Sequence, residues 1–537
     1  MSAQQSNHRP RLAERVAWGA GVLLAAPVVL LRYPPMGDLP LHESLVSLMR
    51  HLGDPHLVPP GVYALSLGPP NQLFHWVAWL LSLALPTDLA CKLVVAAAIL
   101  ATPAAGVRLA RHLGTTSWAS LLVAPLALGF AFRWGLVGNV LALPVVLAAL
   151  PPLDRFVRAP SRAGAAGGAG IMLLAYATHE SALVALAVAA LVLAGASWRE
   201  GARDARTTAL RLVPPAVAAV LVAFFAVWGK HLKAPSILAV PDVFGAGPAA
   251  RLLDVPGVLF GSIEWPVRYG AFALYGVAVA AFLVARRRAR RGAGARFVAV
   301  GAAWTLLYLA MPLALGGSTL LYQRFLPLAL AVLLVAAAPP ADAPLRPLAP
   351  FLAATVPVAT LLVALPSFGT ADRVFRELDA ILAQVAPCSA VAQLDLTPQA
   401  PSAVAPIPGA AARVLAARGG RLLFSFTDAP TSPVTVPPAH QWNEPVLRMT
   451  RDPTEFRPAH DFRRFRYALV RLAPDHALLA PLLTAIMAPE GKLVAQSGEW
   501  LLFESALPVD PLDGPDVPLE LPAAESLRAR ITGLLGR

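Results

Sequence analysis

The stretch VAWGAGVLLAAPVVLLRYPPMGDLPLHE, residues 16–43, decides the class of this protein. It begins with an uncharged apolar run, Val16–Leu31, which is close to the length of about 20 residues with which a helix crosses a bilayer. Three arginines precede the run, and no small-x-small cleavage site comes before the Pro34-Pro35 turn. We therefore predict an uncleaved first membrane span, followed by a loop rich in ionisable residues.

The composition of the whole chain also indicates a membrane protein. Of its 537 residues, 57% are hydrophobic and 14% are charged, and soluble globular domains carry more charge. The formal net charge of +13 would suit nucleic acid, but residues 1–366 hold 28 Lys and Arg against 13 Asp and Glu, whereas residues 367–537 hold 16 against 18. Because the basic excess lies among the apolar segments, we expect it to set the membrane topology, and we expect no nucleic-acid partner.

A search for apolar segments of about 20 residues predicts about eleven membrane-spanning helices. They are expected at residues 14–32, 88–107, 116–132, 139–153, 164–178, 181–198, 212–229, 267–285, 297–315, 325–339 and 348–366. If the N-terminus is cytoplasmic, the cytoplasmic segments contain 19 of the 28 basic residues, as cytoplasmic loops usually do. An odd number of crossings then places the C-terminal tail outside the membrane.

The short apolar segment Asn71–Pro86 is predicted to lie on the outer membrane surface. It is short for a crossing, and His75, Trp76 and Trp79 suit the headgroup region. If it were a span, every later loop would change sides and the arginine-rich turns would lie outside. We therefore expect residues 33–87 to form one outer loop that carries juxtamembrane helices.

The tail, residues 367–537, is predicted to form a small extracytoplasmic α/β domain. Short apolar runs predict strands at Val391–Leu396, Arg421–Phe426 and Phe465–Leu472, and helical spacing predicts helices at Asp372–Val385, Ala410–Ala417 and Asp475–Met487. Ser-Gly between two apolar arms predicts a hairpin at Lys492–Glu504. The expected fold class is an α-helical polytopic membrane protein, residues 1–366, with this α/β domain at its C-terminus.

Ionisable residues gather at the predicted outer ends of the spans, where a charge is costly unless it faces a cavity, a partner or water. The candidates from the first outer loop and from later turns are Asp38, His42, Glu43, Asp54, His56, Arg133, His179, Glu180, Arg268 and Arg324. The dipeptide His179-Glu180 lies in a very short turn between two spans; it is either functional or a solvated turn. Each arginine is either functional or extended towards the lipid headgroups.

Asp38 directly precedes a predicted helix that begins near Pro40. One interpretation is that Asp38 caps this helix by accepting backbone N–H bonds, which would not exclude a second role. Asp38 with His42, or Asp54 with His56, could alternatively ligate a divalent metal such as Mg, Mn or Zn. No HxxxH or HExxH spacing supports such a site.

Several motifs resemble the GT-C class of polyprenyl-phosphate-dependent glycosyltransferases, in particular uncharacterised bacterial relatives. They are DLPLHE at 38–43, RLARHLG at 108–114, FRWGLVGNVLALP at 132–144, YATHESAL at 176–183 and YQRFLPLAL at 322–330. The resemblance covers residues 1–366. It implies an enzyme that takes a sugar from a polyprenyl-phosphate or polyprenyl-diphosphate donor at the outer face of the membrane, with Asp38 as catalytic base or as the residue that arranges acceptor and metal. A second acid is frequent in the class, and Glu43 or Asp54 would have to serve here.

The chemistry of such a transfer agrees with these residue types. A carboxylate has to take the proton of the acceptor, which suits Asp38 with His42 and Glu43 beside it. Cations have to hold the leaving phosphate, which suits Arg133, Arg268 or Arg324. We expect a protein of a bacterial inner membrane that acts on an envelope glycan, lipid or protein. The alternative is a non-catalytic membrane protein or a transporter that presents an envelope lipid, although no internal repeat is visible.

Overall fold

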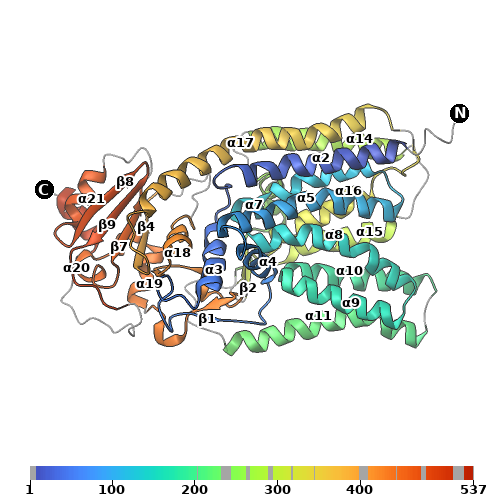
Figure 1. Ribbon diagram of the computed structural model, residues 1–537. Coiled ribbons are helices and arrows are strands. Elements are labelled where there is room, and N and C mark those ends of the chain that lie inside the picture. Colours follow the sequence, from blue (N-terminus) through green and yellow to red (C-terminus); the bar gives the residue numbers. More distant parts are fainter. Residues whose placement is uncertain are drawn as a thin grey trace.

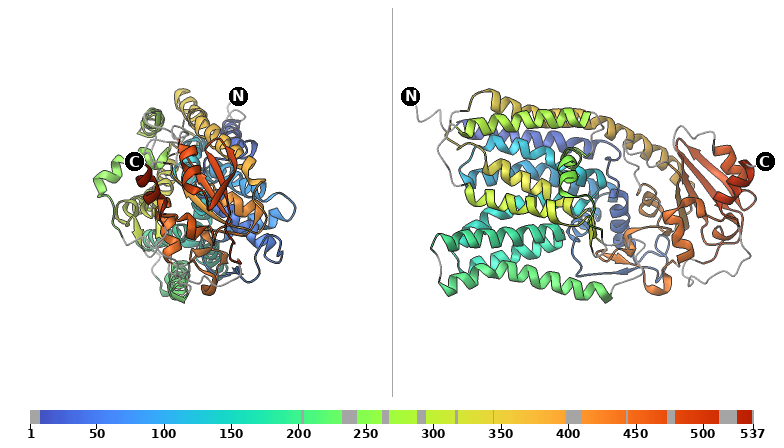
Figure 2. Two further views of the ribbon diagram at one scale, coloured as in Figure 1. Left: turned by 90° about the vertical axis from the view of Figure 1, so that its left-hand side faces the viewer. Right: turned by 180° about the vertical axis from the view of Figure 1, so that it is seen from behind.

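The computed structural model consists of a bundle of helices that carries a smaller, sheet-containing part at one end (Figure 1, Figure 2). It describes residues 8–201, 204–231, 243–261, 267–287, 294–315, 318–343, 345–397, 409–442, 444–472, 479–511 and 525–535. The N-terminal helix begins at the end of the bundle that lies opposite the C-terminal sheet (Figure 1).

Each predicted span coincides with a helical segment. The long helices are α2 (His8–Leu30), α5 (Thr87–Leu113), α8 (Val137–Arg158), α9 (Arg162–Thr178), α10 (Glu180–Arg199), α11 (Ala205–His231), α14 (Val267–Arg287), α15 (Ala295–Ala310), α16 (Phe325–Ala336) and α17 (Leu348–Leu382). Within the described residues, eight segments are long and apolar enough to cross a membrane. Three helices at predicted spans are shorter than these eight segments: α9, α15 and α16 have 17, 16 and 12 residues.

The predicted span 116–132 is broken into short pieces. These are η1 (Ser117–Ala119), α6 (Ser120–Val123), η2 (Ala124–Leu128) and α7 (Phe130–Trp134). Pro125 opens η2 and cannot donate a helical hydrogen bond. At Gly129 the chain passes so close to α13 (Val255–Leu259) that a Cβ would lie 2.8 Å from the carbonyl oxygen of Val258. Pro125 and the close approach of Gly129 to α13 together prevent a continuous helix over residues 116–132.

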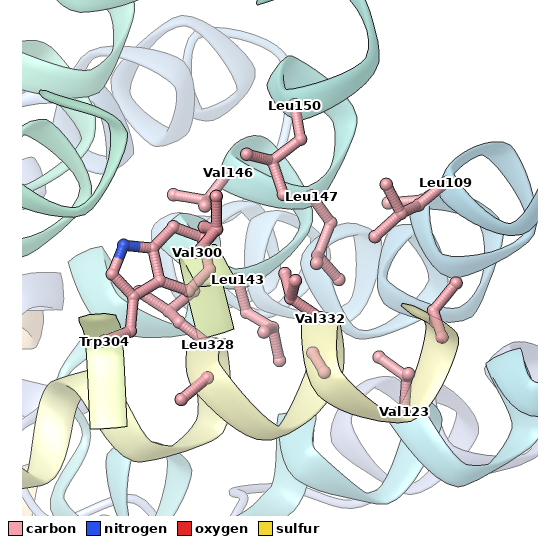
Figure 3. Packing of buried hydrophobic residues seen from close by; sticks show 14 of the residues in the cluster. Leu109, Val123, Leu143, Val146, Leu147, Leu150, Val300, Trp304, Leu328 and Val332 are labelled. Carbon is pink, nitrogen blue, oxygen red and sulfur yellow. The ribbon is translucent and has the colours of Figure 1, made fainter. Parts of the chain in front are cut away.

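Apolar side chains of α5, α6, α8, α15 and α16 fill the centre of the bundle (Figure 3). The labelled residues in that view are Leu109, Val123, Leu143, Val146, Leu147, Leu150, Val300, Trp304, Leu328 and Val332. The indole N–H of Trp304 donates to the carbonyl of Ala185 at 2.9 Å, so this large side chain is buried without an unpaired donor. Gly301 lets α15 approach α16, because a Cβ there would meet Leu333 at 2.5 Å.

The arginine-rich turns meet at the end of the bundle where α2 begins. Glu14 of α2 accepts a hydrogen bond from Arg111 of α5 at 2.7 Å. Asp154 near the end of α8 is fully buried, and three basic side chains lie within 3.3 Å of its carboxylate: His112, Arg158 and Arg296. We call this set the Asp154 cluster. The arginines at 288, 290 and 291 lie outside the described residues.

The outer loop and the remaining turns carry short elements. They are α3 (Leu39–His51), β1 (Ala64–Leu65), α4 (Leu73–Ser82), α12 (Pro248–Leu253), β2 (Ala314–Leu315), β3 (Ser318–Thr319) and η3 (Tyr322–Arg324). Helix α4 has 10 residues, which is too short to span a bilayer.

The C-terminal part contains a five-stranded mixed sheet with the order β5-β4-β7-β9-β8. Its elements are β4 (Ala390–Asp395), α18 (Ala412–Arg418), β5 (Arg421–Leu422), η4 (Phe426–Asp428), β6 (Val434–Thr435), η5 (Pro438–His440), α19 (Glu444–Arg451), η6 (Pro453–Glu455), α20 (Pro458–Asp461), β7 (Tyr467–Arg471), α21 (Leu479–Met487), β8 (Gly491–Ser497), β9 (Trp500–Ser505) and α22 (Leu527–Leu535). Strand β4 runs parallel to β5 and β7, and β9 pairs antiparallel with β7 and β8. The predicted fold class, a helical membrane protein with a small C-terminal α/β part, is confirmed.

Two details of the tail differ from the prediction. Helix α17 runs from Leu348 to Leu382, so the predicted helix Asp372–Val385 is its continuation and the predicted domain boundary at 366/367 lies inside it. Pro366 is accommodated within this helix. The predicted strand Arg421–Phe426 is only two residues long, because the chain turns into η4. The start of the predicted helix 475–487 lies outside the described residues.

Candidate functional site

Helix α3 lies between the bundle and the C-terminal sheet (Figure 1). The tail holds the outer loop in place: β1 pairs antiparallel with β6, the hydroxyl of Tyr63 donates to the carbonyl of Gly420 at 3.0 Å, and that of Ser47 donates to Ala416 at 2.9 Å. Residues far apart in sequence therefore fix the position of α3.

Asp38 immediately precedes α3. Its backbone N–H donates to the carbonyl of Trp134 at 3.0 Å, and that of Gly37 donates to Arg133 at 2.9 Å. Gly135 closes this contact with φ +79°, and a Cβ there would collide with the backbone of Asp38, so only glycine fits. The end of α7 thus fixes the start of α3.

The carboxylate of Asp38 makes no capping hydrogen bond to α3, so the capping interpretation is wrong. Within the described residues we also find no ion pair or other hydrogen bond of this carboxylate. Burial raises its pKa from 3.8 to about 7. Among the described residues, Asp38 is therefore an unpaired acid with a pKa close to neutral pH.

Glu43 has a different environment. It forms a buried ion pair with Arg413 of α18 and accepts a hydrogen bond from the hydroxyl of Tyr33. Arg413 also approaches Asp379 of α17 at 3.3 Å, and Asp379 accepts from Arg32 at 2.7 Å. The carboxylate of Glu43 is occupied by a network that joins α3, α17 and α18, so the structure does not bring it together with Asp38.

His42 pairs with another histidine. Its Nδ1 lies 3.0 Å from Nε2 of His75 in α4, and Phe426 of the tail packs edge-on against its ring. Burial lowers the pKa of His42 well below 6.5 and that of His75 to about 4, so both rings are neutral at pH 7. The prediction placed His75 at the headgroups and did not include it in the site.

The turn between α9 and α10 meets η3. Arg324 Nη1 lies 2.8 Å from His179 Nε2 and donates to Glu180 Oε1, also at 2.8 Å. His179 Nδ1 accepts from the backbone N–H of Ser181 at 3.1 Å and lies 3.0 Å from Ser181 Oγ. Gly138 leaves room for this ring, since a Cβ there would lie 2.6 Å from it. Burial lowers the pKa of His179 to about 4.

This turn adjoins the histidine pair. The backbone N–H of Glu180 donates to Asn71 Oδ1 at 2.9 Å, and Asn71 lies just before α4, which carries His75. His42 and His179 are close enough for the charge of one to lower the pKa of the other. The structure thus joins His42, His179, Glu180 and Arg324, four of the predicted residues, in one region.

The remaining candidates lie apart from this region. Arg133 Nη1 donates to the carbonyl of Gly261. Arg268 lies beside Asp254, whose pKa is raised by burial and partly lowered again by Arg268. His56 is exposed, and its backbone N–H donates to Asp54 Oδ1 at 3.0 Å in a surface turn.

The structure places neither predicted metal pair in a larger group of metal-ligand side chains within the described residues. In the part of the chain that the structure describes, no group of three or more His, Cys, Asp or Glu side chains is placed to hold a metal ion. His42, the histidine paired with Asp38 in that prediction, directs Nδ1 at Nε2 of His75.

No protein-family model and no curated protein matches the chain. Among solved structures, the chain is similar to ArnT from Cupriavidus metallidurans bound to undecaprenyl phosphate, with 14% identity and a TM-score of 0.48 over 92% of this chain and 98% of that one. Similarity this low says nothing about the chemistry of this chain.

Proposed function

We propose that this protein is a membrane glycosyltransferase that moves a sugar from a polyprenyl-phosphate or polyprenyl-diphosphate donor to a cell-envelope acceptor at the outer face of the membrane. The observation that carries the proposal is the carboxylate of Asp38, which has no hydrogen bond or ion pair within the described residues and whose pKa is raised by burial to about 7. It stands between a helical membrane bundle and a domain that could present an acceptor.

Asp38 is suited to act as a general base. A base works best when its pKa is near the working pH, because it is then ionised and still a strong proton acceptor. An ordinary aspartate, paired with a cation, would be a much weaker base. Asp38 would remove the proton of an acceptor hydroxyl as that oxygen attacks the sugar, and His42, one turn further along α3, would line the same side.

Arg133 is the proposed cation for the leaving phosphate. Its backbone carbonyl accepts a hydrogen bond from the N–H of Gly37, next to Asp38, and its guanidinium donates to the carbonyl of Gly261. Arg268 and Arg324 face the carboxylates of Asp254 and Glu180. A guanidinium can hold a phosphate in a bidentate manner and stabilise its developing charge.

We assign the arginine-rich end of the bundle to the cytoplasm and the C-terminal domain to the periplasm of a bacterium. Cytoplasmic turns are enriched in Lys and Arg, and the Asp154 cluster gathers such turns at one end. Asp38 then lies at the outer surface, where lipid-linked donors and envelope acceptors meet.

The test is a deletion strain complemented with wild-type protein, Asp38→Asn or the surface control Asp54→Asn at equal membrane levels. Mass spectrometry of envelope glycans and lipids should show a sugar that the deletion removes and that wild type and Asp54→Asn restore. Asp38→Asn should restore less than a hundredth of it, since a general base contributes about 10²–10⁴-fold. Full restoration by Asp38→Asn would exclude the base role. A change in lipid distribution without any lost sugar would favour the transporter alternative.

A further inference from the structure

Within the described residues, three buried polar atoms without a hydrogen-bond partner lie on η3 and on α8, the helix whose Asn139 is bonded to Ser181 beside the His179 turn: Asn139 Oδ1, Gln323 Oε1 and Arg324 Nε. With their neighbours they form the outer polar cluster, which we define as His75, Asn139, His179, Glu180, Gln323 and Arg324. A buried polar atom that lacks a partner is costly and uncommon in a folded protein. Several of them together indicate a place where a ligand supplies the missing bonds.

The cluster is connected by contacts within the protein. Asn139 Nδ2 donates to Ser181 Oγ at 2.9 Å, and Ser181 Oγ lies 3.0 Å from His179 Nδ1. Arg324 reaches both His179 and Glu180 at 2.8 Å. These bonds use one side of each polar group and hold the other side in a fixed orientation.

The unpartnered atoms are mainly acceptors. Two of them are the amide oxygens of Asn139 and Gln323, and one is a guanidinium N–H of Arg324. The charge of Arg324 is balanced by Glu180 in an ion pair. The histidines of the cluster have pKa values of about 4 and are neutral at pH 7. A phosphate would meet several oxygens and no spare positive charge here, whereas hydroxyl groups would donate to those oxygens.

We infer that the outer polar cluster binds the hydroxyl groups of the sugar carried by the donor, and that the phosphate is held elsewhere. In this assignment Arg324 orients Glu180 and His179 and donates Nε–H to a sugar oxygen; it does not neutralise the phosphate. The inference rests on the proposed function, which it deepens by separating sugar recognition from phosphate recognition.

Gln323→Met is the most informative substitution. Within the described residues the side chain of Gln323 has no hydrogen bond to lose, so the fold should tolerate a side chain of similar size. Gln393→Met in β4 is the matched control, because Gln393 Oε1 is also buried without a partner but lies in the C-terminal sheet. Unfolding temperatures of both variants check that the fold is intact.

The probes are a short-chain polyprenyl phosphate and the same lipid carrying glucose, mannose, galactose or N-acetylglucosamine, titrated calorimetrically into the detergent-purified full chain. Wild type should bind one loaded lipid more tightly than the bare lipid. Gln323→Met should weaken binding of that loaded lipid roughly fivefold to hundredfold, the effect of one lost hydrogen bond to a buried group. It should leave binding of the bare lipid unchanged, and Gln393→Met should equal wild type.

Other outcomes separate the two proposals. The inference is overturned if no sugar improves binding, or if Gln323→Met weakens binding of the loaded and the bare lipid equally or of neither. In these cases the outer polar cluster does not recognise the sugar, while the proposed function stands. If wild type binds neither the bare lipid nor any loaded lipid, the proposed function itself fails, and the inference fails with it.

Discussion

Two aspartates at opposite ends of the bundle show how differently an acidic residue near a membrane can be used. Asp154 is fully buried and has His112, Arg158 and Arg296 within 3.3 Å. Asp38 is fixed by its backbone, and its carboxylate has no hydrogen bond or ion pair within the described residues. A carboxylate surrounded by basic side chains holds helices together. A carboxylate that has no such neighbours and a raised pKa is available to accept and release a proton.

The largest predicted effect on stability is that of Asp154→Asn. Removing the carboxylate leaves three basic groups facing one another with only the more distant Glu200, at 3.8 Å from Arg296, to balance them; breaking such a buried pair typically costs about 3–5 kcal/mol. Denaturant unfolding of the detergent-purified protein should show this loss, while transfer per folded molecule stays at the wild-type level. Wild-type stability would mean that the Asp154 cluster does not hold the bundle together.

Glu43→Gln should have the next largest effect, about 1–3 kcal/mol of stability, because Arg413 stays buried and loses the nearer of its two carboxylate partners. Replacing both residues, Glu43→Gln with Arg413→Met, should recover part of the loss, since no uncompensated charge remains. The measurement is a double-mutant cycle of unfolding free energies. If Glu43→Gln abolished transfer and left stability unchanged, Glu43 would belong to the chemistry and Asp38 would not be the sole acid.

Glu43 and Asp38 also show how much of the site could be predicted from the sequence. The spans were predictable because apolar length is a local property of the chain, and so was α3, because Pro40 marks its start. The ion pair of Glu43 was not, since its partner lies 370 positions away. With no partner visible, Glu43 looked as suitable for catalysis as Asp38.

The region around His179 was predicted only in part. The dipeptide His179-Glu180 was conspicuous because charge in a short turn between spans is costly. His75 was assigned to the headgroups because tryptophans surround it in the sequence, and only the fold places it against His42. The continuity of α17 was missed because Pro366 coincides with a change in composition, which usually marks a domain boundary.

The pH dependence of transfer should distinguish Asp38 from a carboxylate with an ordinary pKa. A base must be ionised to work, so with a pKa of about 7 for Asp38, transfer should fall about tenfold for each pH unit below 7 and level off above it. A profile of initial rates from pH 5 to pH 9 measures this, with stability at each pH as the control. A profile that is flat down to pH 5 would show that the group in use has an ordinary carboxylate pKa.

The smallest effects should come from the surface turn of the outer loop. Asp54→Asn and His56→Ala should change the free energy of unfolding by no more than about 0.5 kcal/mol, since exposed positions rarely contribute more. Transfer and its dependence on added Mg or Mn should match wild type. A loss of transfer that added metal reverses would reinstate these residues as metal ligands.

The most direct test of the account is the stability of Asp38→Asn at several pH values. The pKa of Asp38 is raised from 3.8 to about 7 in the folded protein, so ionising it costs stability that grows from about pH 4 to pH 7 and is constant above. Asp38→Asn should therefore unfold at a temperature equal to or above that of wild type at pH 8, by a margin that shrinks towards pH 5, although its transfer is lost. A lower unfolding temperature at pH 8, as expected for Asp154→Asn, would show that the carboxylate of Asp38 is a structural partner and would contradict the account.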